Sequence, residues 1–225
     1  MNGQAIWVAG PPELVLEFQE QFPLPTVSAP DEADWIVVLD LEPDALRSRW
    51  ERLPENRAIR LVNATTVLAL ECALRSPYPD RVVGLHLLPG LLRLEQLELV
   101  RTELTSPEVE ARVEALCRGS GKTPQWVADR IGGVLPRMLC ALINEACTAV
   151  QEQVAAPEEV DVAMELGTNY PRGPFAWMRQ LGARNVMTVL EALFMDLGEP
   201  RYRISPVLRR YALLEPVSQG EARTR

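Results

Sequence analysis

The chain contains a single histidine, His86, which lies within an apolar stretch, GLHLLPGLLRLEQLEL (residues 84–99). An imidazole titrates near neutral pH and is well suited to act as a general base. Glu98 follows twelve residues later, and a carboxylate beside the second ring nitrogen of a histidine fixes its tautomer and stabilises the imidazolium. Taken by itself, a lone histidine in an apolar strand is more often a packed core residue than a base, so both interpretations stand here.

Composition and charge limit the classes of partner. The 225 residues are 47% hydrophobic and 24% charged, with a net charge of −8, which is ordinary for a globular protein but offers no basic excess for nucleic acid or an anionic membrane surface. We expect no spanning helix, because no apolar run reaches about 18 residues. The spacing of the cysteines at 72, 117, 140 and 147 fits neither a zinc site nor a disulfide framework, which predicts reduced thiols, no metal and a cytoplasmic location.

The first half of the chain alternates between strand and helix patterns. Apolar or β-branched runs predict strands over residues 4–9, 35–41, 58–63 and 81–87, and amphipathic segments predict helices over 13–22, 44–52 and 65–74. Alternation of this kind predicts a parallel sheet with helices on both faces.

From about residue 120 the pattern becomes helical. A helix from Pro157 to Leu166 is expected to end at Gly167, and a helix over residues 185–197 at Gly198, since glycine favours the left-handed conformation after a helix. The sequence therefore predicts an α/β domain over residues 1–118, an all-α domain over 122–214 and a polar tail over 215–225.

Several stretches, taken in order, resemble one family. They are ADWIVVLDLEPDALRSRW, VNATTVLAL, GLHLLPGLLRLEQLELV, GKTPQWVADRIGG, LINEACTAV, PEEVDVAMELGTNYPRGPF and GEPRYRISPVLRR. Together they resemble the 3-hydroxyacyl-CoA dehydrogenases from residue 33 to about 214, with YPRGPF as the most specific segment. The resemblance implies a Rossmann domain that binds NAD, here truncated, and a helical C-terminal domain that closes the cleft and forms a homodimer. It also implies an acyl-CoA as the small-molecule partner.

The resemblance gives several residues candidate roles. The family pairs a catalytic histidine with a glutamate twelve positions later, which implies His86 as the base that oxidises a 3-hydroxyl group and Glu98 as its partner. If this pair is intact, Glu98 should bond one ring nitrogen while the other faces the cleft near Thr65. Thr65 stands where the family has an assisting serine, and a helix N-cap is the alternative. Asn63 matches the asparagine that opens that motif and is a substrate-binding candidate, although asparagine is also common in turns.

The residues that follow the junction depart from the family pattern. The family has Pro-Gly-Phe, two residues and Asn-Arg, whereas this chain has IGGVLPR over residues 131–137. The family's asparagine helps to hold the substrate and the catalytic histidine, so Pro136 occupies a substrate-binding position without a side-chain donor or a backbone N–H. Proline is tolerated there as a residue near a helix start.

The cofactor region departs further. A G-x-G-x-x-G turn normally brings the backbone close to the pyrophosphate, and the register here gives Gly10, Pro12 and Val15. Only Gly10 remains as a candidate cofactor-binding residue. The acidic residue expected for the ribose has no convincing counterpart. The residues of the second strand, its helix and the third strand are expected to be missing between about residues 21 and 33, so we expect weak or absent NAD(H) affinity.

Three interpretations remain open. The chain is a working NAD-dependent oxidoreductase with a small cofactor domain, a relic that binds acyl-CoA or another ligand without redox chemistry, or a structural or regulatory dimer. The His86–Glu98 pair favours the first, whereas the altered glycine turn, the deletion and Pro136 favour the others. We expect the homodimer to use helices of residues 134–214, with Phe175, Trp177 and Met178 either at the interface or in the domain's own core.

Overall fold

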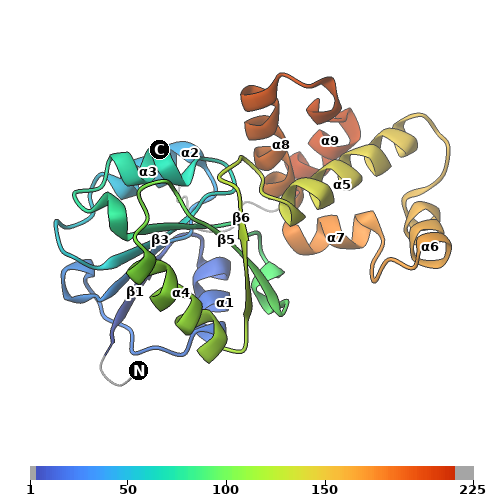
Figure 1. Ribbon diagram of the computed structural model, residues 1–225. Helices are drawn as coiled ribbons and strands as arrows, with labels where there is room; N and C mark the ends of the chain where they lie inside the picture. Colours follow the sequence, from blue (N-terminus) through green and yellow to red (C-terminus); the bar gives the residue numbers. More distant parts are fainter. Residues whose placement is uncertain (1–3, 216–225) are drawn as a thin grey trace, which may run out of the picture.

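The structure, a computed structural model, describes residues 4–215 and forms a sheet-containing domain beside a helical domain (Figure 1). The strands are β1 (Ile6–Ala9), β2 (Trp35–Val38), β3 (Ile59–Asn63), β4 (Val82–Leu85), β5 (Gln96–Val100) and β6 (Thr123–Val127). The sheet domain also contains α1 (Pro12–Gln21), α2 (Pro43–Trp50), α3 (Ala69–Leu74) and α4 (Pro107–Gly119). The helical domain contains α5 (Leu135–Gln151), α6 (Pro157–Thr168), α7 (Pro174–Leu181), α8 (Ala183–Leu197) and α9 (Pro206–Leu214). The expected fold class, an α/β domain followed by a helical domain, is confirmed.

The six strands lie in the order in which they follow one another along the chain, β1-β2-β3-β4-β5-β6. β1 to β4 are parallel, β5 is antiparallel to β4, and β6 is parallel to β5. The four strands that the sequence predicted are parallel, as expected, and β5, which the sequence did not predict, runs antiparallel to them. The residues between β4 and β5 are fewer than the dozen or so that a parallel crossover needs, so the chain turns back on itself.

The first crossover differs in hand from the second. α1 packs on the sheet face that carries Val37, whereas α2 packs on the opposite face with Ile36 and Val38. Because both crossovers step in the same direction across the sheet, helices on opposite faces give them opposite hands. Right-handed crossovers are nearly universal. A left-handed first crossover fits the expectation that the second strand, its helix and the third strand of the family are missing between α1 and β2. In the described chain, only a bridge at Thr26 pairs with the outer edge of β1.

Two sequence-based boundaries are corrected by the structure. The domain boundary expected at residue 122 falls before β6, which extends the sheet to Val127. This strand escaped the sequence analysis because it is a half-exposed edge strand that contains a proline. α6 continues through Gly167, and Asn169 takes the left-handed conformation that ends it, while Gly198 ends α8 as expected. The last part of the expected tail, residues 216–225, lies outside the described residues.

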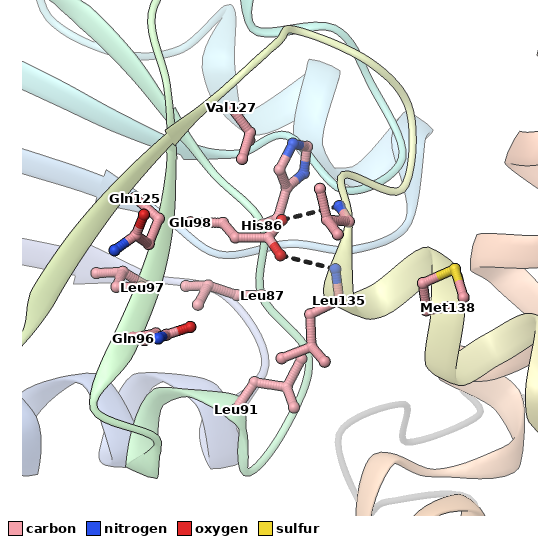
Figure 2. A pocket seen from close by; sticks show the side chains of 11 residues that line it. His86, Leu87, Leu91, Gln96, Leu97, Glu98, Gln125, Val127, Leu135 and Met138 are labelled. Atoms are coloured by element: carbon pink, nitrogen blue, oxygen red, sulfur yellow. Dashed lines mark hydrogen bonds between the residues drawn. The ribbon is translucent and has the colours of Figure 1, made fainter.

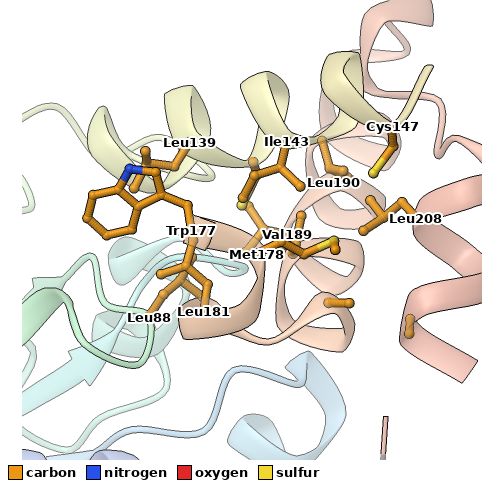
Figure 3. Packing of buried hydrophobic residues seen from close by; sticks show 14 of the residues in the cluster. Leu88, Leu139, Ile143, Cys147, Trp177, Met178, Leu181, Val189, Leu190 and Leu208 are labelled. Atoms are coloured by element: carbon orange, nitrogen blue, oxygen red, sulfur yellow. The ribbon is translucent and has the colours of Figure 1, made fainter. Parts of the chain in front are cut away.

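The helical domain has a core that continues into the sheet domain (Figure 3). Leu41, Leu88 and Leu91 of the sheet domain pack in this core with residues of α5, α7, α8 and α9. The candidate interface residues Phe175, Trp177 and Met178 are buried in the same core. Of the two placements expected for these three residues, the structure shows the one in the domain's own core.

The four cysteines lie inside the protein. All four cysteines are free and buried, and burial raises the pKa of Cys72 and Cys147 to about 12, so their thiols are inert. Within residues 4–215, no helix combines the length and the apolar character needed to cross a membrane.

Candidate active site

The hairpin formed by β4 and β5 explains the spacing of His86 and Glu98. Gly84 pairs with Val100 and Leu85 with Leu99, so the next pair in this antiparallel register is His86 with Glu98. The backbone N–H of His86 donates to the carbonyl oxygen of Glu98 at 3.2 Å. Directly opposed residues of an antiparallel pair project from the same face of the sheet. The twelve-residue offset is therefore the register of a β-hairpin.

The carboxylate of Glu98 binds the start of α5 (Figure 2). Its Oε2 accepts from the backbone N–H of Val134 at 2.9 Å and its Oε1 from that of Leu135 at 2.7 Å. These are unpaired donors of a helix N-terminus, where a negative charge is favourable. The expectation that Glu98 bonds a ring nitrogen of His86 is not met, because both carboxylate oxygens bind α5.

His86 is enclosed rather than open to a cleft. His86 is 3% exposed. Within the described residues, neither of its ring nitrogens has a hydrogen-bond partner. Burial lowers the pKa of His86 to about 4, and the charge of Arg137 adds to the effect. The imidazole is therefore neutral at pH 7 and weakly basic. The expected nitrogen facing a cleft near Thr65 is not observed, since both nitrogens are closed off from solvent.

Gly133 allows the start of α5 to lie against this pair. Its φ is +54°, and an added Cβ would collide with the His86 ring and come within 2.6 Å of Glu98 Oε2. The family pattern has phenylalanine at this position. A glycine here lets the chain approach closely enough for Glu98 to reach the N–H groups of α5.

Asn63 and Thr65 link the end of β3 to the segment after β4 through buried hydrogen bonds. The hydroxyl of Thr65 donates to Asn63 Oδ1 at 2.7 Å and accepts from the backbone N–H of Leu87 at 2.9 Å. Asn63 Nδ2 donates to the Leu87 carbonyl oxygen at 3.2 Å. Both side chains are fully buried, and their polar groups are used within the protein.

The alternative role of Thr65 as a helix cap is also wrong. α3 begins at Ala69, and the N–H groups of Ala69 and Leu70 donate to the Asp129 carboxylate at 2.9 and 2.8 Å. Asp129 is sixty residues away from Ala69 along the chain, so this contact could not be inferred from local sequence. Pro136 lies in the first turn of α5 and is buried, as expected for a proline near a helix start.

A pocket of about 400 Å³ lies between β5, β6 and the start of α5 (Figure 2). Most of its lining is aliphatic, and no lysine or arginine within residues 4–215 contributes to it. The lining residues are His86, Leu87, Leu91, Gln96, Leu97, Glu98, Gln125, Val127, Val134, Leu135 and Met138. Gln125, which is the β6 partner of Glu98, was not predicted as a site residue, because β6 was not predicted as a strand. Gln96 could have been predicted as a site residue, because alternation along a strand places it on the same face as Glu98.

Comparison with known proteins identifies the family of the chain. Residues 132–223 match the family described as 3-hydroxyacyl-CoA dehydrogenase, C-terminal domain. The crystal structure of (S)-3-hydroxybutyryl-CoA dehydrogenase from Ralstonia eutropha is similar with a TM-score of 0.69 and 30% identity, covering 83% of this chain and 69% of that one. The chain belongs to the 3-hydroxyacyl-CoA dehydrogenase family.

Curated relatives of this 3-hydroxyacyl-CoA dehydrogenase family member are longer than the matched region. A probable 3-hydroxybutyryl-CoA dehydrogenase of Bacillus subtilis is 35% identical over 161 residues, which cover 72% of this chain and 56% of the relative. The 3-hydroxyadipyl-CoA dehydrogenase of Escherichia coli is 46% identical over 95 residues, or 42% of this chain and 20% of the relative. The chain thus spans about half the length of the Bacillus relative.

The residues at the start of α1 do not fit the dinucleotide of a 3-hydroxyacyl-CoA dehydrogenase. Pro11 and Pro12 open α1 and have no backbone N–H to offer a pyrophosphate, and Glu13 adds a negative charge in the first turn. Gly10, at φ +147°, lets β1 approach β2, because an added Cβ would lie 2.8 Å from the Cβ of Leu39. Gly10 therefore has a structural reason to be glycine that does not depend on a cofactor.

The sheet of this family member also lacks the usual dinucleotide crevice. That crevice forms where the strand order reverses beside the first strand, whereas β1 is here an edge strand and the described order does not reverse. The chain after β2 instead meets the helical domain. Leu41 packs in the helical core, and the Thr188 hydroxyl of α8 donates to Glu42 Oε1 at 2.8 Å.

Proposed function

We propose that this chain binds the acyl part of an acyl-CoA in the pocket beside His86 and does so without NAD(H). It is a family member that has kept a ligand site and given up redox turnover. The largely aliphatic lining supports an acyl ligand, since ligand pockets of about 300–1,000 Å³ are lined mostly by apolar side chains with a few polar groups. The acyl-CoA class comes from the named relatives.

The observation that carries the proposal is the strand order. A sheet in which β1 lies at the edge has no reversal point at which a dinucleotide would bind. The absence of N–H groups at Pro11 and Pro12 acts in the same direction. Each lost contact to a pyrophosphate removes a charge-assisted hydrogen bond of about 1.5–3 kcal/mol, so two losses move a micromolar site towards the millimolar range.

The state of His86 supports binding rather than proton transfer. A general base needs a nitrogen within reach of the proton it accepts, and both ring nitrogens of His86 are enclosed. The lowered pKa of His86, about 4, makes the ring a weak base at neutral pH.

Calorimetric titration of the chain with butyryl-CoA and, separately, with NADH tests the proposal. Butyryl-CoA is expected to bind saturably, and NADH is expected to show no saturable binding below about 1 mM. Met138→Trp should weaken butyryl-CoA binding by filling the pocket, whereas Met195→Trp, at a more exposed site on α8 outside the pocket, should leave it unchanged. Saturable binding of NADH at low micromolar concentration would overturn the proposal.

A second candidate function is a working dehydrogenase, and the cross-strand pairing of His86 with Glu98 favours it. It predicts NADH-dependent reduction of acetoacetyl-CoA that His86→Gln abolishes. If the wild-type chain shows no such reduction with both compounds at millimolar concentration, this candidate fails.

We also propose that the chain is a cytoplasmic homodimer assembled through its helical domain. The cytoplasmic location is supported by the four free, buried cysteines. The dimer is supported by α6, which has no buried residue and exposes Val162 and Leu166. Apolar side chains gathered on one helix mark an interaction surface.

A further inference from the structure

We infer that the pocket beside His86 accepts neutral acyl chains and rejects chains that end in a carboxylate. The inference rests on the proposed function and adds a selectivity to it. The relatives are named for both kinds of acyl chain: one for 3-hydroxyadipyl-CoA, which ends in a carboxylate, and another for 3-hydroxybutyryl-CoA, which does not.

The charges around the pocket carry the inference. Glu98 is the one lining side chain with a formal charge at neutral pH, and that charge is negative. His86 is neutral there, because burial lowers its pKa to about 4. A carboxylate that enters the pocket therefore loses its hydration and meets another carboxylate. The nearby cation, Arg137, acts on His86 but is not among the lining residues, and its guanidinium donates to the carbonyl oxygen of Ile131.

The hydrogen-bond donors lead to the same conclusion. The backbone N–H groups of Val134 and Leu135, which would suit a carboxylate, already bind Glu98. The side-chain amides of Gln96 and Gln125 belong to exposed residues at the solvent side of the pocket. The buried part of the lining is made by His86, Leu87, Leu91 and Leu97. The leucines present only hydrocarbon to the end of an acyl chain, and both ring nitrogens of His86 are closed off from solvent. No described donor there replaces the water that a carboxylate would lose.

Butyryl-CoA and succinyl-CoA form the test pair, since both have four acyl carbons and differ only in a terminal methyl or carboxylate. In calorimetric titration of the full chain, succinyl-CoA is expected to bind at least about tenfold more weakly. The difference should persist when salt is raised from about 0.15 M to about 0.5 M, which screens repulsion between the ligand and the acidic chain as a whole.

A variant with an added positive charge tests whether the selectivity arises in this pocket. Leu135→Lys places a flexible ammonium on the half-buried wall of the pocket and should reduce the preference for butyryl-CoA, whereas Leu135→Met, a neutral control, should keep it. Thermal melting establishes whether each variant folds, and the wild-type comparison decides the question if Leu135→Lys does not fold. A difference below tenfold, or one that disappears in salt, overturns the inference and leaves acyl-CoA binding standing. If neither compound binds, the proposed function fails and the inference fails with it.

Discussion

His86 is a histidine held neutral by its surroundings, and folding stability should show this. Its pKa in the folded chain is lowered to about 4 by burial, with a contribution from Arg137, whereas an unfolded histidine titrates at about 6.5. The unfolded chain therefore binds a proton in this window that the folded chain does not. We expect stability to fall as pH decreases from about 6.5 to about 4, with His86 contributing about 3 kcal/mol to the loss.

Urea unfolding of the wild type and of His86→Gln at several pH values isolates this contribution. Carboxylates also titrate in the window, so the wild-type curve alone does not identify the histidine. The variant should lose about 3 kcal/mol less stability between pH 7 and pH 4 than the wild type does. Parallel curves for the two proteins would show that folding does not lower the pKa of His86.

Gly133 offers a second test at the scale of one residue. Gly133→Ala places a Cβ at φ +54° and against the His86 ring, whereas Gly121, at φ +72°, has no atom within 4 Å of an added Cβ. Gly121→Ala should cost about 1–2 kcal/mol from the backbone conformation alone, and Gly133→Ala should cost a further 1–3 kcal/mol, roughly, from the collision. Equal unfolding free energies for the two variants would mean that the helix start is not held against His86.

At the scale of elements, Glu98 joins the β4–β5 hairpin to α5. Its carboxylate accepts two backbone N–H groups at the helix N-terminus, so Glu98→Gln removes a charge that the helix end favours and weakens those bonds. We expect a loss of about 1–3 kcal/mol in unfolding free energy. Glu152, at the opposite end of α5, is the control, because Glu152→Gln removes a carboxylate from the end that disfavours it. Equal effects of the two substitutions would rule out the cap.

At the scale of the whole molecule, the exposed apolar residues of α6 should be covered in a dimer. Leu166 is 83% exposed on a helix without a buried residue. Light scattering should give about twice the chain mass of 25.1 kDa, and Leu166→Lys should shift the chain towards monomer by placing charges in the interface. Leu74→Lys changes a residue that is 69% exposed on α3 of the sheet domain and should leave the dimer intact. A wild-type monomer at micromolar concentration would reject this assembly.

The sequence predicted the four parallel strands and the change to a helical domain, because these depend on local hydrophobic periodicity. It did not predict β5, β6, α4, α7 or α9, and so placed the domain boundary one strand too early. β6 has a proline and a half-exposed surface, and it becomes a strand only because β5 is present to pair with it. Edge strands of this kind depend on their neighbours more than on their own propensity.

At the site, the sequence by itself determined which residues face each other. The offset between His86 and Glu98 is the register of a hairpin, and a hairpin lies within one short stretch of chain. The partner of the Glu98 carboxylate was decided only by the tertiary structure, because the N–H groups it binds are 36 and 37 residues further along the chain. Hydrogen bonds between residues so far apart in the sequence depend on how the two domains pack. Only the folded chain brings a helix N-terminus, with its unpaired N–H groups, to a particular carboxylate.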